Sequence, residues 1–162
     1  IEIGKSMPAK IAVVGEKDGT LDYKQRRSKM NWIPFTHGWI YAQLEAWMNN
    51  INSTHMGFHQ LRIGEPCQFT MYSKKNFYNW HTDSSHNFVD TPPVRKMSAT
   101  ILLNDPKEFK GGEMQLIDNR RTAILKQGYG IFFASFIVHR VKPVTKGTRY
   151  SLVAWFGGPP LS

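Results

Sequence analysis

From residue 58 onward the sequence consists of short stretches in which apolar and polar residues alternate, and this alternation constrains the fold more than any other feature. Successive side chains of a β-strand point to opposite faces, so a period of two indicates strands. Clusters such as Gly64-Glu65-Pro66 and Lys110-Gly111-Gly112 separate the stretches and are typical of turns. The expected strands cover residues 58–63, 67–72, 77–83, 97–104, 113–117, 121–126, 130–134, 137–142 and 148–156. Many short strands joined by turns predict a β-sandwich or β-barrel.

A helix is expected before these strands. Its apolar residues recur at helical spacing: Trp39, Ile40, Leu44, Trp47, Met48 and Ile51. With Thr36 as a candidate N-cap, the pattern predicts an amphipathic helix of about 14 residues that packs against a sheet. Residues 5–31 are polar and basic, and we expect an irregular entry with one short strand there. Ile1 to Lys5 resembles a helix end stopped by Gly4, which suggests that a short N-terminal segment is missing.

Composition narrows the class of protein. The 162 residues are 41% hydrophobic, enough for one buried core, so we expect a single domain over residues 1–162. No apolar run is long enough to span a bilayer and no leader is evident, so we expect an intracellular protein without a membrane partner. The single cysteine, Cys67, is expected to be a buried strand residue. The net charge of +9 could attract nucleic acid or an acidic protein, or belong to a solvated surface.

His81, Asp83 and His139 are the group of residues that points most directly to chemistry. Residues i and i+2 of a strand share a face, so His81 and Asp83 should point the same way. Alternation in the segment from Phe136 to Val141 places His139 on an inward, apolar face, where a lone histidine would more often be a core residue. Two imidazoles and one carboxylate can bind one face of a ferrous ion and leave its other positions open. The three residues therefore predict an iron site.

Arg149 and Ser151 are again two residues apart on one expected strand, with Val153 and Trp155 continuing the same face. A guanidinium offers a planar fork of donors and the hydroxyl offers another, a combination that suits a carboxylate. The alternative is an ordinary surface arginine at the start of a strand. A turn at Lys146-Gly147 would bring Arg149 back beside the strand of His139, and we therefore interpret it as a clamp for the distal carboxylate of 2-oxoglutarate.

Several of these segments together resemble the prolyl 4-hydroxylase-like oxygenases. The resemblance is carried by the segments Phe69 to Asp83, Arg95 to Pro106, Phe109 to Met114 and His139 to Ser151. The last of them looks most like the PKHD-type hydroxylases of bacteria and phages. The match covers about residues 30–156, and its motifs occur in the family's order. It implies a location in the bacterial cytoplasm, or in the host cytoplasm if a phage encodes the protein.

The resemblance implies a mainly β fold with a flanking helix, the double-stranded β-helix or jelly roll. It assigns Fe(II) to His81, Asp83 and His139, and the 5-carboxylate of 2-oxoglutarate to Arg149. Tyr72 matches a tyrosine that often hydrogen-bonds this co-substrate. Dioxygen would be the second co-substrate and ascorbate a candidate accessory reductant. The implied reaction converts 2-oxoglutarate to succinate and carbon dioxide while hydroxylating an unactivated C–H bond, with a prolyl residue of a protein or peptide as the expected target.

Four further residues are candidates for the substrate side. Arg95 matches an arginine that in some relatives touches the substrate backbone, and Tyr78, Trp80 and Trp155 are candidate pocket walls, with core packing as their alternative. Two departures weaken the transfer of substrate identity. Ser98 stands where the prolyl hydroxylase string R-x-x-T-x-x-x-Y-L-N has threonine, and Leu102 stands where it has tyrosine.

Other interpretations stay open at this stage. The positive charge favours a nucleic-acid demethylating oxygenase, although that class places another arginine where this chain has Trp155. A jelly-roll binding module without turnover is a non-enzymatic alternative, and a zinc site of His81 and His86 is a further one. The segment from Ser84 to Val94 is the candidate lid over the substrate. Gly111-Gly112 is expected to be a hairpin connection without a chemical role.

Overall fold

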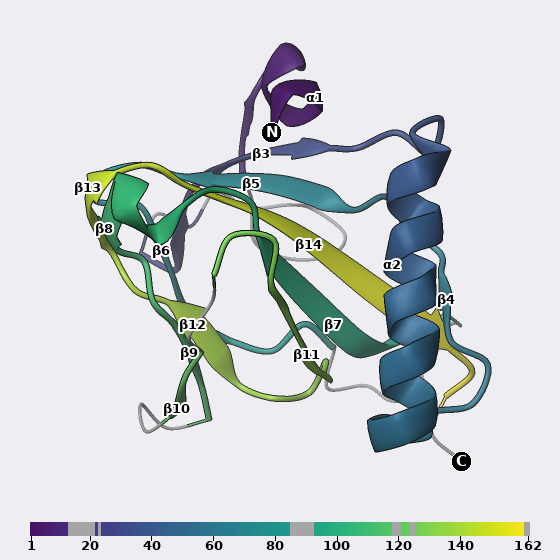
Figure 1. Cartoon of the computed structure of the whole chain (residues 1–162). Helices are drawn as coiled ribbons and strands as arrows, with labels where there is room; N and C mark the ends of the chain where they lie inside the picture. Colours follow the sequence, from purple (N-terminus) through teal and green to yellow (C-terminus); the bar gives the residue numbers. More distant parts are fainter. Residues whose placement is uncertain (13–21, 23, 85–92, 118–120, 124–125, 161–162) are drawn as a thin grey trace.

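The computed structural model (Figure 1) describes residues 1–12, 22, 24–84, 93–117, 121–123 and 126–160. Within these ranges the chain is mainly β, as the alternation predicts, and the strands of its sheets pair antiparallel. The candidate lid from Ser84 to Val94 falls almost entirely outside the described residues. His86 lies outside them as well.

The major sheet has the strand order β1-β3-β5-β14-β7-β11, with β4 paired to the far end of β14. Its strands are β1 (Lys10–Ile11), β3 (Lys29–Trp32), β4 (Arg62–Ile63), β5 (Gln68–Tyr72), β7 (Val94–Leu102), β11 (Gly130–Ala134) and β14 (Arg149–Gly158). The long strands β7 and β14 pair over most of their length, from Ser151 opposite Leu102 to Gly158 opposite Val94. This pair forms the centre of the sheet.

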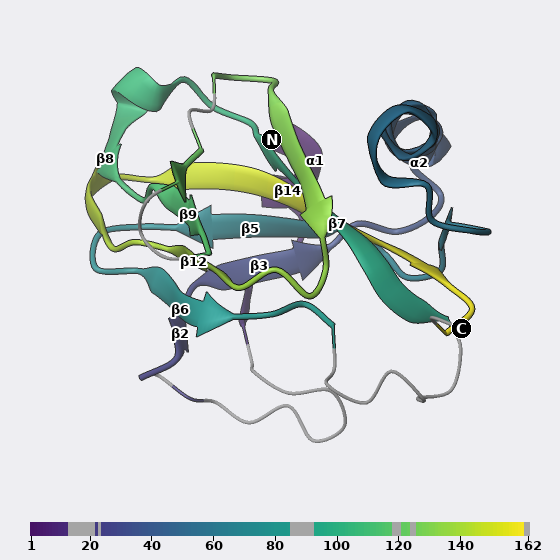
Figure 2. The ribbon, with the colours of Figure 1, turned by 90° about the horizontal axis from the view of Figure 1, so that it is seen from below.

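The minor sheet has the order β10-β9-β12-β6-β2. Its strands are β2 (Arg26–Arg27), β6 (Phe77–His81), β9 (Met114–Leu116), β10 (Arg121–Thr122) and β12 (His139–Val141). A third, two-stranded sheet pairs β8 (Phe109–Gly111) with β13 (Val144–Gly147). Figure 1 shows β9 and β12 below the layer of β3, β5 and β14, and in the view from below in Figure 2 β12 overlaps β5 and β3. The two sheets therefore face each other, as in a jelly roll.

The two faces of the major sheet have different partners. On one face, Phe69, Ala99 and Phe156 pack against the helix α2 (Gly38–Ile51), which Figure 1 shows beside β7, β14 and β4. The helix contributes Tyr41, Leu44 and Met48, which are buried at a spacing of three and four residues. The alternate residues of the same strands face the minor sheet, where the cavity described below lies.

The remaining helices are short: α1 (Glu2–Ser6), the π-helical turn η1 (Asn52–Met56) and the 3-10 turn η2 (Pro106–Glu108). Two expectations about helix ends are wrong. The N-cap of α2 is His37 and not Thr36, and no side chain caps this end. Gly4 does not end a helix but lies inside α1. The absence of a side chain lets the helix approach Phe69, since a Cβ there would lie 2.3 Å from the ring.

Strand boundaries also differ in places. The expected strand over residues 77–83 ends at His81. The described part of the polar entry contains three short strands, β1, β2 and β3, which lack the apolar alternation that reveals the others. Among the described residues, no helix is both long and apolar enough to cross a membrane.

Candidate metal centre

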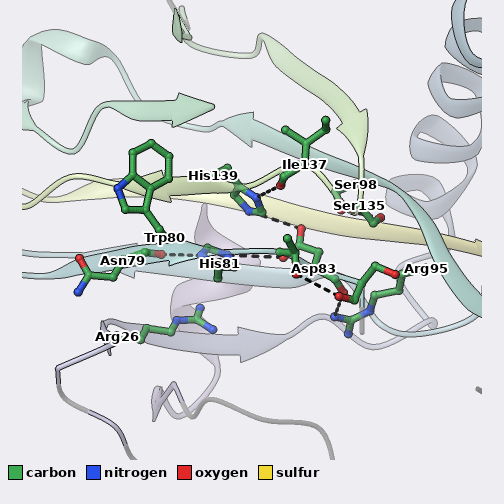
Figure 3. A network of polar contacts seen from close by, with 12 residues as sticks. Arg26, Asn79, Trp80, His81, Asp83, Arg95, Ser98, Ser135, Ile137 and His139 are labelled. Atoms are coloured by element: carbon green, nitrogen blue, oxygen red, sulfur yellow. Dashed lines mark hydrogen bonds and ion pairs between the residues drawn. The ribbon is translucent and has the colours of Figure 1, made fainter. Parts of the chain in front are cut away.

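The two histidines of the predicted site lie directly opposite each other on neighbouring strands. His139 of β12 pairs with His81 of β6, and their ring centroids are 4.1 Å apart. Asp83 lies two residues beyond the end of β6, in a bend, so it does not share a strand face with His81 as expected. Its backbone N–H donates instead to the carbonyl of Ser135, 2.9 Å away. This bond turns the chain so that the carboxylate still returns to the histidines (Figure 3).

One potential ligand atom from each residue lies within 4.8 Å of the other two. Nε2 of His81 and Nε2 of His139 are each 3.6 Å from a different carboxylate oxygen of Asp83. The Nδ1 atoms point away, to the carbonyl oxygens of Asn79 at 2.7 Å and Ile137 at 2.9 Å. Because a carbonyl can only accept, both Nδ1 atoms carry the proton and both Nε2 lone pairs face the carboxylate. Such backbone bonds fix the tautomer that a metal ligand needs.

The electrostatics of the cluster favour the metal-binding forms of Asp83 and His139. Burial alone would raise the pKa of Asp83, but the neighbouring imidazoles of His81 and His139 hold it well below its usual range. The neighbouring Ser98 hydroxyl, which also bonds the Ser135 hydroxyl at 2.9 Å, lowers the pKa of Asp83 further. Burial lowers the pKa of His139, which favours the neutral imidazole.

A cavity of about 780 Å³ opens in front of this cluster, and its wall carries Arg149 and Ser151 of β14. The two residues share a face as predicted, and Arg149 Nη1 donates to Ser151 Oγ at 2.9 Å. The Arg149 side chain is not at the surface but 2% exposed. Its guanidinium lies 5.8 Å from the centre of the Tyr72 ring. Among the described residues, its Nη2 has no hydrogen-bond partner, and burial lowers the pKa of this arginine.

Three of the four substrate-side candidates also line the cavity. The Tyr78 ring stacks on the His81 imidazole with centroids 3.4 Å apart, and burial raises the Tyr78 pKa. Arg95 lies over the Trp155 ring at 4.2 Å and donates to the carbonyl of Asp83 at 3.3 Å. Trp155 keeps its buried indole N–H without a partner among the described residues.

Trp80 is the exception, because it does not line the cavity; its ring lies 4.6 Å from the Arg140 guanidinium. Trp80 directly precedes His81 on β6, so alternation turns it to the opposite face. Tyr78 reaches the cavity because of an irregularity in the β6–β12 ladder. Two steps along β12, from His139 to Val141, match three steps along β6, from His81 to Tyr78. A bulge of this kind shifts the alternation by one residue. Tyr78 and His81 therefore reach the same cavity although they are three residues apart.

Sequence reasoning missed several residues of the cavity wall. Arg26 donates to Ser28 Oγ at 2.9 Å and to Gln68 Oε1 at 2.7 Å, and its guanidinium lies 4.5 Å from the Tyr78 ring. Glu65 forms a bidentate ion pair with Arg95, in which Nε donates to Oε1 at 2.6 Å and Nη2 donates to Oε2 at 2.5 Å. The alternation of β5 could have revealed Gln68, which shares a face with Tyr72, but the polar entry gave no signal for Arg26.

The residues present fit a ferrous ion and a dicarboxylate. Two neutral imidazole nitrogens and one carboxylate oxygen can occupy one face of the ion and leave the cavity side open. The unpartnered, buried Nη2 of Arg149 suits an anionic group deeper in the same cavity. A jelly roll with this arrangement has the architecture of the non-haem iron oxygenases.

Comparison with known proteins defines the family. Residues 67–157 match the family model of the 2OG-Fe(II) oxygenase superfamily, and the chain belongs to this superfamily. A PKHD-type hydroxylase of Prochlorococcus marinus is 36% identical over 89 residues, which are 54% of this chain and 39% of that protein. A PKHD-type hydroxylase of Alteromonas mediterranea is 33% identical over 99 residues, 58% of this chain and 43% of that protein. The matched region thus spans about two fifths of the length of these curated relatives.

Solved structures support the same fold. The viral collagen prolyl hydroxylase of Paramecium bursaria Chlorella virus-1 aligns with a TM-score of 0.71 at 21% identity, covering 83% of this chain and 80% of that one. A prolyl-4-hydroxylase of Pseudomonas putida aligns with a TM-score of 0.64 at 21% identity, covering 83% and 73%. The expected double-stranded β-helix is therefore confirmed.

Proposed function

We propose that this protein is an Fe(II)- and 2-oxoglutarate-dependent dioxygenase that hydroxylates a prolyl residue of a protein or peptide. The observation that carries the proposal is the convergence of two imidazole Nε2 atoms and one carboxylate on the cavity that also holds a buried arginine. Family membership and the names of the curated relatives support it. Ascorbate is proposed only as an accessory reductant.

In this proposal His81, Asp83 and His139 hold the iron. The bound iron, with 2-oxoglutarate and dioxygen, supplies the oxidising power that converts C–H to C–OH while 2-oxoglutarate becomes succinate and carbon dioxide. The carbonyls of Asn79 and Ile137 hold the two imidazoles so that their Nε2 atoms face the carboxylate of Asp83.

Arg149 would bind the distal carboxylate of 2-oxoglutarate, with Ser151 and Tyr72 beside it. Ser151 accepts from Nη1 and so fixes the plane of the guanidinium, which leaves Nη2 as the donor directed to the ligand. A charged hydrogen bond of this kind is worth about 1.5–3 kcal/mol. Burial makes the site selective, because a ligand without a distal carboxylate leaves the charge unpaired.

Tyr78, Trp155 and Arg95 are the proposed substrate contacts. The Trp155 N–H can donate to a backbone carbonyl of a peptide, and the flat rings of Tyr78 and Trp155 can pack against a pyrrolidine ring. The second candidate is oxidation of methylated nucleic acid, which only the net charge of +9 favours.

The test is to incubate the protein, Fe(II) and 2-oxoglutarate with a bacterial lysate and to search by mass spectrometry for peptides with an added oxygen atom. His81→Ala should abolish the products. His59→Ala removes an exposed histidine that does not line the cavity and should leave them unchanged. Addition of oxygen to prolyl residues supports the proposal. Products confined to other side chains remove the prolyl assignment, and oxidation of methylated DNA or RNA alone would favour the second candidate.

A further inference from the structure

Asn104 lies just beyond the end of β7 and is 2% exposed. Its side-chain oxygen accepts from the backbone N–H of Tyr150 at 2.9 Å, and its amide nitrogen donates to the backbone carbonyl of Thr148 at 3.0 Å. Tyr150 and Thr148 are the two chain neighbours of Arg149. One side chain therefore holds the backbone on both sides of the arginine that faces the cavity.

The position of Asn104 explains why a side chain is needed here. Backbone pairing between β7 and β14 extends to Leu102 opposite Ser151, and the N–H of Leu103 still donates to Tyr150 O at 2.9 Å. The chain then turns away into η2. Without Asn104, the N–H of Tyr150 and the carbonyl of Thr148 would lose these hydrogen bonds on the β7 side of the strand. Only β5 would remain beside this part of β14, with Tyr72 opposite Arg149. The amide of Asn104 thus extends the ladder by one further step.

The orientation of the Asn104 amide is defined by a third bond. Its nitrogen also donates to Glu108 Oε2 at 3.0 Å, and a carboxylate cannot donate in return. The amide nitrogen must therefore face Glu108 and Thr148, which leaves the oxygen for Tyr150. The amide is fixed at both of its polar atoms, and so is the backbone that carries Arg149.

We propose that Asn104 is a positioning residue that fixes Arg149 in the geometry needed to bind the distal carboxylate of a 2-oxo diacid. The inference rests on the proposed function, in which Arg149 binds 2-oxoglutarate. A bidentate fork is sensitive to small displacements, and a shift of about 1 Å at such a clamp can cost on the order of 100-fold. Asn104 acts through Arg149 and does not line the cavity itself.

A purely structural role for Asn104 makes a different prediction, and Asn31 provides the matched control. Asn31 is 3% exposed and its amide nitrogen also donates to two oxygens, the carbonyls of Gly4 and Met7, at 2.7 and 3.2 Å. It ties α1 to β3 and does not line the cavity. Asn31→Ala and Asn104→Ala both remove a buried amide, but only the second removes a support of Arg149.

The experiment measures binding by calorimetry to the full chain loaded with Mn(II), which does not turn over. Two ligands are compared: 2-oxoglutarate, and 2-oxopentanoate, which has the same chain length and metal-chelating end but no distal carboxylate. In Asn104→Ala we expect the Kd of 2-oxoglutarate to rise by about tenfold or more. The Kd values of 2-oxopentanoate and of Mn(II) should stay within about twofold of the wild-type values, because neither ligand binds Arg149. Asn31→Ala should leave all three unchanged.

Equal losses for both ligands, or equal losses in both alanine variants, would overturn the inference. If an alanine variant does not fold, Asn104→Asp and Asn31→Asp replace the pair. The Asn104→Asp variant keeps an acceptor for Tyr150 but loses the donor to Thr148, so the same discrimination against 2-oxoglutarate should appear.

Arg149→Met separates the proposed function from the inference about Asn104. If this variant binds 2-oxoglutarate as tightly as the wild type, the proposed role of Arg149 fails and the inference with it. If it loses binding while Asn104→Ala keeps it, only the inference fails.

Discussion

Replacing Arg149 with methionine should make the ligand-free protein more stable while removing its affinity for 2-oxoglutarate. The Arg149 side chain is 2% exposed, and its Nη2 has no partner among the described residues. A buried polar group without a partner costs about 1–3 kcal/mol, more if charged. Methionine keeps an unbranched apolar stem and sacrifices the hydrogen bond to Ser151, worth about 1 kcal/mol. The free energy of unfolding should therefore rise by about 1 kcal/mol.

This gain corresponds to a rise of about 2–4 °C in melting temperature for a protein of this size. Bound 2-oxoglutarate should reverse the order of the two melting temperatures. With Mn(II) present and 2-oxoglutarate at about 100 times its Kd, the free energy of unfolding of the wild type rises by about 2.7 kcal/mol. The variant lacks the guanidinium and should gain little. Differential scanning calorimetry with and without 2-oxoglutarate measures both effects. A variant that melts below the wild type without ligand, or that keeps the full ligand-induced shift, would refute the reasoning.

Three further predictions concern other parts of the fold. Gly112→Ala should weaken 2-oxoglutarate binding measured by calorimetry, because the new Cβ would lie 3.1 Å from Cδ of Arg149. Gly57→Ala, which has the same left-handed φ of +70 but open space around it, should cost stability alone, about 1 kcal/mol. Burial lowers the pKa of His139, so below about pH 6.5 the unfolded chain takes up a proton that the folded chain does not. The metal-free protein should therefore lose stability as the pH falls from 7.5 to 5.5, as urea titrations would measure. Burial also raises the pKa of the Cys67 thiol, so iodoacetamide should modify it only after unfolding, as mass spectrometry would show.

A specific outcome would contradict each of these three predictions. Equal 2-oxoglutarate affinity in the two glycine variants would show that Gly112 does not support Arg149. A stability that is flat between pH 7.5 and 5.5, or that rises as the pH falls, would contradict the direction given for His139. Rapid alkylation of the native protein would contradict the burial of Cys67.

The alternation of residues predicted much of this fold because burial repeats every second residue in a strand. Arg149, Ser151, Val153 and Trp155 all line the cavity, as one face of a strand should. The same rule failed where a ladder is irregular: the bulge between β6 and β12 brought Tyr78 into the cavity beside His81, although the two are three residues apart. Asp83 reached the site through a bend held by Ser135, a contact distant in the sequence that periodicity cannot reveal.

The parts that the sequence did not predict depend on tertiary contacts. Gly112 was expected to serve only a hairpin, yet its lack of a side chain makes room for Val144 and Arg149. Arg26 lies in a polar segment without periodicity, so its place in the cavity wall follows only from the pairing of β2 with β6. A single domain over residues 1–162 stays a prediction.

The most direct test of the account is a crystal structure of the protein loaded with Mn(II) and 2-oxoglutarate, with the metal located by its anomalous scattering. We expect one metal peak within bonding distance of Nε2 of His81, Nε2 of His139 and a carboxylate oxygen of Asp83. We also expect the distal carboxylate of 2-oxoglutarate on the Arg149 guanidinium. A peak elsewhere, or a metal that lacks one of these three ligands while 2-oxoglutarate binds away from Arg149, would contradict the account.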